Sequence, residues 1–96
     1  MPKKRPPLEV WREIRAIVWE RDGGLCQHCR QAVGLDACHI DHIQSGKLGT
    51  NALRNLRVLC RRCHTLRADP RHRGLIANAL RDGIIPANWR ELVWED

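Results

Sequence analysis

The pattern of apolar and polar residues is helical over the first third of the chain. The apolar positions that share one helical face are Val10, Trp11, Ile14, Ile17 and Val18. Residues recurring at this spacing line one side of an α-helix, so the pattern predicts an amphipathic helix over Leu8–Arg21. The run Asp22-Gly23-Gly24 should end it, because glycine readily takes the left-handed conformation that follows many helix ends.

Two shorter apolar stretches predict a pair of strands. Leu35–Ile40 is typical of one short strand, and Leu56–Leu59 of a second in which Arg57 faces water. Residues 44–53, between them, are rich in glycine, serine, threonine and asparagine, which is the composition of a loop.

The remaining segments are short and interrupted by proline or glycine. We expect helices over Cys63–Ala68, ended by Asp69-Pro70, and over Gly74–Arg81, followed by an extended segment at residues 84–89. Residues 1–7 hold three prolines and three basic side chains, which favours a flexible basic arm. A chain of 96 residues makes one domain at most. A hydrophobic core this small is often stabilised by a cross-link such as a disulfide or a bound metal ion.

Four cysteines could provide such a cross-link. They form two CxxC pairs, Cys26 with Cys29 and Cys60 with Cys63, which are separated by thirty residues. Two CxxC turns can close a tetrahedral Zn²⁺ site that has no open position, so the site should be structural. A rival ligand set would combine Cys38 or His39 with one pair. We expect Cys38 to be a small buried side chain instead.

Charge and targeting signals restrict the function further. The net charge is +6, and residues 25–69 carry seven basic but only three acidic side chains. A basic surface around a metal site favours a polyanion such as nucleic acid. We find no signal peptide and no membrane-spanning run. We therefore expect an intracellular, cytoplasmic protein of bacterial or phage origin that has no membrane partner. Reduced thiols in that compartment favour metal over disulfides.

Four short motifs occur in a fixed order around the cysteine pairs. They are Arg21–Cys29 (RDGGLCQHC), Asp41-His42-Ile43, Asn55–Cys60 (NLRVLC) and Cys60–His64 (CRRCH). In this order they resemble the HNH endonuclease family, also called ββα-metal nucleases. The resemblance implies a small α+β fold with two antiparallel strands and a helix around the active site, closed by a four-cysteine zinc knuckle and flanked by helices. It further implies one nuclease domain over residues 8–96, with its core at 21–69 and a helical extension at 70–96.

The resemblance also implies a role for each motif residue. Asp41 and His64 would hold a catalytic divalent metal, His42 would be the general base, and Asn55 would hold the loop that orients His42. Family members cleave DNA phosphodiester bonds to a 3′-hydroxyl and a 5′-phosphate, using Mg²⁺ or a metal such as Mn²⁺, Ni²⁺ or Zn²⁺.

Physical chemistry supports these implied roles. A neutral imidazole can take a proton from water near neutral pH, and a metal with two protein ligands keeps positions open for phosphate. Neighbouring strand residues point to opposite faces, so Asp41 and His42 can serve one phosphate only where the strand ends or bends.

The chain departs from the family pattern in two places. The loop after Ile43 lacks the family's proline and glycine pair, and Arg67 stands where the family often has lysine. Basic residues that we expect to contact DNA are Arg54, Arg57, Arg61, Arg62, Arg67 and, in the arm, Lys3, Lys4 and Arg5. The expected partner is double-stranded DNA with weak sequence preference, within larger phage, restriction or repair machinery.

Two other functions use fewer of these residues. A non-catalytic zinc module that binds nucleic acid explains the cysteines and the charge but leaves Asp41, His42, Asn55 and His64 unused. A zinc domain for protein interaction explains the cysteines alone. The sequence leaves the roles of Cys38, His39 and the tryptophans Trp89 and Trp94 open, with packing the expected role of the tryptophans.

Overall fold

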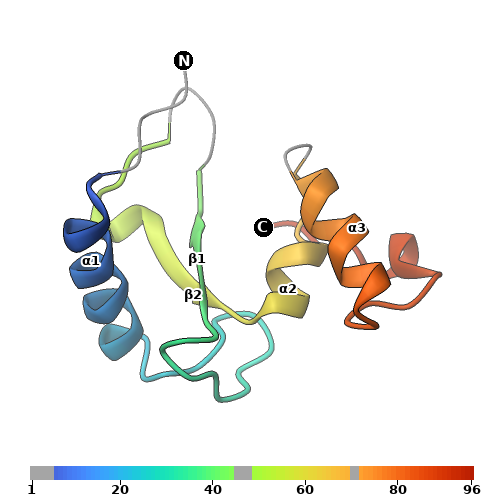
Figure 1. Ribbon diagram of the computed structural model, residues 1–96, viewed down its shortest axis with the longest axis horizontal. Coiled ribbons are helices and arrows are strands. Elements are labelled where there is room, and N and C mark those ends of the chain that lie inside the picture. Colours follow the sequence, from blue (N-terminus) through green and yellow to red (C-terminus); the bar gives the residue numbers. More distant parts are fainter. Residues whose placement is uncertain (1–5, 45–48, 70–71) are drawn as a thin grey trace.

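A computed structural model describes residues 6–44, 49–69 and 72–96 of the chain (Figure 1). Along the sequence the elements are α1 (Leu8–Arg21), β1 (His39–His42), the 3₁₀ turn η2 (Leu53–Asn55), β2 (Leu56–Leu59), α2 (Arg61–Leu66), α3 (Arg73–Arg81) and the 3₁₀ turn η4 (Trp89–Leu92). The predicted α+β class is confirmed. The basic arm residues Lys3, Lys4 and Arg5 lie outside the described residues.

The two strands form an antiparallel sheet in which each strand has one neighbour among the described residues. His39 lies opposite Leu59, and Asp41 lies opposite Arg57. Figure 1 shows α1 on one side of this pair and α2 with α3 on the other. Because side chains alternate along a strand, each strand sends residues toward both sides. The sheet therefore separates two environments that meet at its open edges.

The end of α1 is fastened to the start of β2. The guanidinium of Arg21 donates to the carbonyls of Leu53 and Leu56 at 2.7 and 2.6 Å, and Asp22 Oδ2 accepts from the backbone N–H of Val58 at 2.9 Å. Gly24 follows with φ +69°, and a Cβ there would lie 3.0 Å from the Trp19 ring. The motif that opens the first cysteine pair thus ends the helix and docks it on the sheet.

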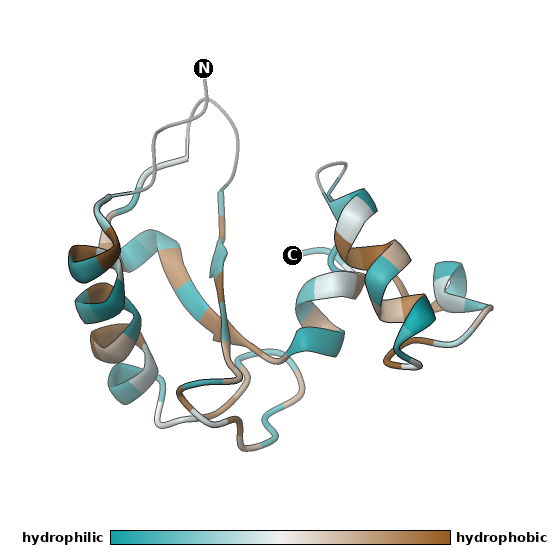
Figure 2. Cartoon of the chain, in the orientation of Figure 1, coloured by the Kyte–Doolittle hydropathy of each residue, from teal (hydrophilic) through white to brown (hydrophobic). Residues whose placement is uncertain are grey.

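The buried apolar residues fall into three small clusters rather than one core. The first lies between α1 and the sheet and contains Trp11, Val18, Cys38, Leu56 and Val58. The second surrounds Cys26, Leu59 and Cys63, and the third joins α2, α3 and the following turn. Trp94 packs against both of these latter clusters. Figure 2 shows apolar stretches on either side of a polar band along β2.

The first strand begins later than the apolar pattern predicts. Residues 35–37 form a turn, in which the N–H groups of Ala37 and Cys38 both donate to the carbonyl of Gly34. The predicted strand over Leu35–Ile40 is therefore wrong in its bounds, and β1 runs from His39 to His42 instead. Asp41 and His42 both belong to it, and it ends directly after His42.

The helices after β2 also differ from expectation. Helix α2 begins two residues before Cys63 because Cys60 serves as its N-cap, its Sγ accepting from the N–H of Cys63 at 3.4 Å. The expected extended segment at 84–89 is wrong, since Ile84 and Trp89 donate to the carbonyls of Ala79 and Pro86 in successive turns. In the part of the chain that the structure covers, every helix is too short or too polar to cross a bilayer.

Candidate metal centres and active site

Four cysteine thiols converge at the junction of the sheet with α2. The Sγ atoms of Cys26, Cys29, Cys60 and Cys63 all lie within 4.8 Å of one another. The first pair belongs to the turn after α1, and the second to the start of α2. The sequence expectation of a four-cysteine cluster therefore agrees with the structure, and this donor set is the one that structural Zn²⁺ prefers.

Backbone hydrogen bonds shape the first cysteine turn. The N–H of Arg30 donates to the carbonyl of Cys26 at 2.9 Å, with Arg30 in the left-handed region at φ 66°. The N–H of Gln27 donates to the carbonyl of Val58 at 2.9 Å, which attaches the turn to β2. The second pair needs no separate loop, because the α2 N-cap supplies its turn.

Three thiols of the cluster differ in how readily they ionise. Burial alone would raise the pKa of Cys26, but backbone N–H groups of Cys29, Cys60 and His28 lower it to about 7. Burial raises the pKa of Cys60, and burial together with the neighbouring thiols raises that of Cys63. The fold thus favours a thiolate at Cys26, and a bound metal would favour deprotonation of Cys60 and Cys63.

Cys38 lies outside this cluster. Its side chain is buried between α1 and the sheet, and its Sγ donates to the carbonyl of Leu35 at 3.3 Å. Burial raises the pKa of this thiol. The arrangement agrees with the expected packing role and gives no support to a ligand set that mixes Cys38 with one CxxC pair.

A second group of metal-binding side chains lies on the α2 side of β1. It consists of Asp41, His64 and His72, whose donor atoms lie within 4.8 Å of one another. Asp41 Oδ1 is 3.5 Å from His64 Nε2, and the Asp41 side chain is only 2% exposed. Asp41 and His64 are thus brought together as the sequence motifs imply, and His72 joins them from the start of α3.

Two arginines compensate the buried carboxylate. Arg57 Nε donates to Asp41 Oδ2 at 2.9 Å, and Arg67 donates to Asp41 Oδ1 at 3.1 Å. Both guanidinium groups also pair with Asp96, so two carboxylates and two guanidinium groups alternate in one network. Arg67 further donates to the carbonyls of His42 and Ile43. The network fixes the Asp41 carboxylate and the end of β1 together.

Three imidazoles pack beside Asp41. His39 Nδ1 and His64 Nδ1 are hydrogen-bonded at 2.8 Å, and the rings of His64 and His72 meet edge to face with centroids 4.7 Å apart. Burial, helped by the charges of His72, His39 and Arg67, lowers the pKa of His64 to about 3. Burial also lowers the pKa of His39. A neutral imidazole has a lone pair for a metal, so the low pKa suits His64 as a ligand.

His42 points to the other side of β1. Its ring stacks on that of Trp11, with centroids 6.2 Å apart and planes 6° apart, and its Nε2 is 2.9 Å from Asn51 Oδ1. An amide oxygen only accepts hydrogen bonds, so Nε2 carries the proton of the neutral ring and Nδ1 has the lone pair.

Asn55 fastens both ends of the loop that follows His42. Its Oδ1 accepts from the N–H of Gln44 at 2.9 Å, and its Nδ2 donates to the carbonyls of Gln44 and Thr50. Thr50 directly precedes Asn51, the partner of His42. These bonds agree with the expected role of Asn55 in holding the loop beside His42, and that role stays a prediction for activity.

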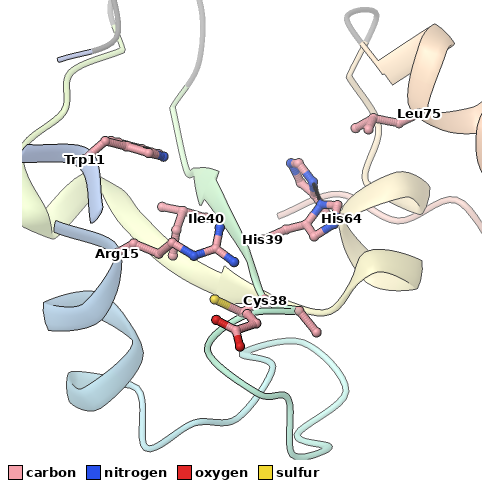
Figure 3. Close-up of a pocket in the computed structure, with 9 residues that line it drawn as sticks. Trp11, Arg15, Cys38, His39, Ile40, His64 and Leu75 are labelled. Atoms are coloured by element: carbon pink, nitrogen blue, oxygen red, sulfur yellow. Dashed lines mark hydrogen bonds between the residues drawn. The ribbon is translucent and has the colours of Figure 1, made fainter. Parts of the chain in front are cut away.

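A pocket of about 490 Å³ opens where the two sides of β1 meet (Figure 3). Trp11 and Arg15 line it from α1, Ile40 and His39 from β1, and His64 and Leu75 from α2 and α3. In Figure 3 the Arg15 side chain extends from α1 toward the strand. The pocket thus joins the side that holds Trp11 to the side that holds His64.

The structure divides the arginines expected to bind DNA into two groups. Arg57 and Arg67 have side chains only 15% and 11% exposed and are engaged in the Asp41 network, so the expectation that Arg57 faces water is wrong. Arg61 pairs with Asp82 at 2.6 Å. Arg54 and Arg62 are exposed. Phosphate contacts stay a prediction for Arg54, Arg61, Arg62 and the arm, and for Arg57 and Arg67 they would have to coexist with the ion pairs of the Asp41 network.

Sequence reasoning missed four residues of this site: Arg15, Asn51, His72 and Asp96. His72 comes from beyond the recognised motifs, and a histidine eight positions after His64 follows no metal-ligand spacing. Asn51 lies in the stretch that its composition predicts to be a loop, and the helical pattern alone predicts no functional role for Arg15. The sequence offered one hint for His72 and Asp96: both are residue types that often bind metals or form ion pairs, and no motif explained either of them.

Comparison with known proteins agrees with the motifs. Residues 26–69 match the family model described as HNH endonuclease, which confirms the resemblance over that segment. Neither the curated proteins nor the solved structures contain a match to the chain. The family match suggests a function related to nucleic acid, and the clustered cysteines could bind zinc.

The cysteine cluster predicts a zinc-dependent fold. Cys63→Ser should lower the zinc content below one ion per chain and lose the folded far-UV circular dichroism signal, because the metal joins α2 to the turn after α1. Cys38→Ala is the matched control, since that thiol is buried but outside the cluster. Equal zinc content in the two variants, measured by atomic emission, would contradict this assignment.

The Asp41 network predicts unequal effects for two arginines near one helix. Arg67→Gln should lower the free energy of unfolding by about 1.5–3 kcal/mol, the usual cost of losing a hydrogen bond to a charged group. Arg62→Gln, at an exposed position of α2, should change it by less than about 0.5 kcal/mol. Urea unfolding of the zinc-loaded proteins measures both free energies. An equal effect of the two substitutions would show that the hydrogen bonds of Arg67 do not stabilise the fold.

Proposed function

We propose that this chain, whose residues 26–69 belong to the HNH endonuclease family, is a metal-dependent endonuclease or nickase that hydrolyses DNA phosphodiester bonds. The supporting observation is the convergence of Asp41 and His64 on one side of β1, with His42 adjacent in the same strand. One member of this ligand pair, His64, also lines the pocket beside β1, together with His39 and Ile40 of the strand.

Asp41 and His64 would hold the divalent cation of this proposal. Their facing atoms, Oδ1 and Nε2, are 3.5 Å apart. Arg67 occupies only one of the two lone pairs of Asp41 Oδ1, so the other is available. When bound, such a cation supplies charge neutralisation on the phosphate and on the departing oxygen. Arg57 and Arg67 keep the carboxylate in one orientation while it does so.

His42 would take the proton from the attacking water at Nδ1. The bond from Nε2–H to Asn51 Oδ1 fixes this tautomer, and the stack on Trp11 fixes the plane of the ring. Asn55 holds the backbone on both sides of this arrangement through Gln44 and Thr50. A base with a fixed tautomer avoids the cost of reorienting during proton transfer.

The substrate backbone would cross the open edge of β1. The pocket there is lined by the Arg15 guanidinium, which donates to the carbonyl of Leu35 through Nε and through one terminal nitrogen. A guanidinium has five donors, so this bond leaves others to contact phosphate. Exposed Arg54 and Arg62 would extend the contact by charge. The products would have a 3′-hydroxyl and a 5′-phosphate, as the family resemblance implies.

One observation favours a second function, a zinc module that binds nucleic acid without cutting it. Arg57 and Arg67 together neutralise Asp41, so the carboxylate is stable in its buried position without a catalytic cation. A non-catalytic module does not explain why a hydrogen bond to Asn51 fixes the tautomer of His42, or why Asn55 holds the loop beside it. The two functions differ in whether bound DNA is cut.

Plasmid nicking tests the proposal. The zinc-loaded protein should nick supercoiled plasmid with Mg²⁺ or Mn²⁺, and EDTA should stop it. His42→Ala should lower the rate by about 10²–10⁴-fold, the usual contribution of a general base, and leave DNA binding intact. His28→Ala, an exposed histidine stacked on Trp94, should cut at the wild-type rate. Binding of plasmid without metal-dependent nicking would establish the non-catalytic module instead.

DNA affinity tests the placement of the backbone. Arg15→Gln should weaken duplex binding and reduce the slope of log affinity against log salt by about one, because one phosphate contact is lost. Arg90→Gln is the control, since that exposed guanidinium lies over the Trp89 ring at 4.6 Å. Fluorescence anisotropy over a range of salt concentrations gives both slopes. An unchanged slope for Arg15→Gln would show that the DNA backbone does not contact Arg15 in this pocket.

A further inference from the structure

We infer that His72 is a third protein ligand of the catalytic cation, and that the resulting set of two imidazoles and one carboxylate selects a first-row transition ion such as Mn²⁺ over Mg²⁺. The inference rests on the proposed function in taking Asp41 and His64 as ligands of one ion. It adds the N-cap residue of α3, which lies beyond residues 26–69, the segment that matches the family model.

The geometry of the three side chains supports a shared ion. The donor atoms of Asp41, His64 and His72 all lie within 4.8 Å of one another. Two donors that each bind a metal at 2.0–2.2 Å are separated by less than twice that distance, so small adjustments suffice. The His72 side chain is 8% exposed and packs edge to face on His64. His72 is therefore held beside the other two ligands rather than in solvent.

The outer hydrogen bonds of the two imidazoles leave the same nitrogen available. His72 Nδ1 is 3.2 Å from the carbonyl oxygen of Arg67, which only accepts, so Nδ1 carries the proton and Nε2 has the lone pair. His64 uses Nδ1 for His39, so its Nε2 faces Asp41. Ligating histidines usually donate their other ring N–H, as His72 does to the Arg67 carbonyl. His64 does the same when Nδ1 of His39 is the acceptor of their shared hydrogen bond. His39 thereby serves as a positioning residue for His64.

The charges around Asp41 explain why the donor set matters. Arg57 and Arg67 pair with both carboxylate oxygens and reduce the negative charge offered to a hard cation. Mg²⁺ relies on carboxylate oxygens and water, whereas imidazoles bind transition ions better. A site with one neutralised carboxylate and two imidazoles should therefore bind Mg²⁺ weakly. The third ligand offsets part of the repulsion from the nearby guanidinium groups.

His72 has one alternative role in the fold. Its Nε2 is 3.9 Å from Asp69 Oδ2, so a protonated His72 would form an ion pair with Asp69 at the start of α3. That role needs no cation and predicts that replacing His72 changes stability but not metal affinity. Direct measurement of metal binding separates the two roles.

Binding of Mn²⁺ to the zinc-loaded protein, followed by electron paramagnetic resonance, tests the inference without reference to nicking. The wild-type chain should bind one Mn²⁺, and Mg²⁺ should compete weakly. His72→Phe keeps a ring against His64 but removes both nitrogens, and it should weaken Mn²⁺ binding at least about tenfold. His28→Phe, the matched control, should bind as the wild type does. His72→Asp should restore binding and shift the preference toward Mg²⁺.

A second measurement uses the wild-type chain alone, in case His72→Phe loses its folded circular dichroism signal. Substoichiometric Mn²⁺ should broaden the imidazole NMR signals of His64 and His72 to a similar degree, and both more strongly than those of His28. Wild-type Mn²⁺ affinity in His72→Phe, or a sharp His72 signal, would overturn the inference. Mn²⁺ bound through His72 without any nicking would instead overturn the proposed function and leave this site standing.

Discussion

The buried carboxylate of Asp41 is the constraint around which the site is organised. An ionised group that is 2% exposed is stable only where opposite charges and hydrogen bonds compensate it. Arg57 comes from the partner strand and Arg67 from the residue after α2, so satisfying one side chain fixes the sheet relative to the helix. Asp96 then links the two arginines, which adds the segment after η4 to the same structure.

The cysteine cluster and the Asp41 site are mechanically connected. His64 directly follows Cys63, so an ion held by the cysteines would fix the backbone that presents the imidazole. Trp94 adds to this connection, since its Nε1 donates to the carbonyl of Cys63. A chain with three small apolar clusters relies on such polar and metal-based links more than on one core.

The alternation of side chains along β1 separates its residues into two groups that face different helices. His39 and Asp41 face α2 and its histidine, while Ile40 and His42 face α1 and Trp11. Under the proposed function, the candidate metal ligands and the candidate base would therefore lie on opposite sides of one strand. The strand ends directly after His42.

The sequence by itself determined the features that depend on local spacing. The bounds of α1 and β2 and the glycine stop after Asp22 follow from residues close together in the chain. Each CxxC pair is likewise recognised by its own short spacing. Only the tertiary structure decided the start of β1, the burial of Arg57 and Arg67, the Asn51 partner of His42 and the approach of His72 to Asp41. The contacts of Asn51 with His42 and of Arg57, Arg67 and His72 with Asp41 join residues that are 9 to 31 positions apart. Spacing does not encode such contacts, because they arise when separate elements pack.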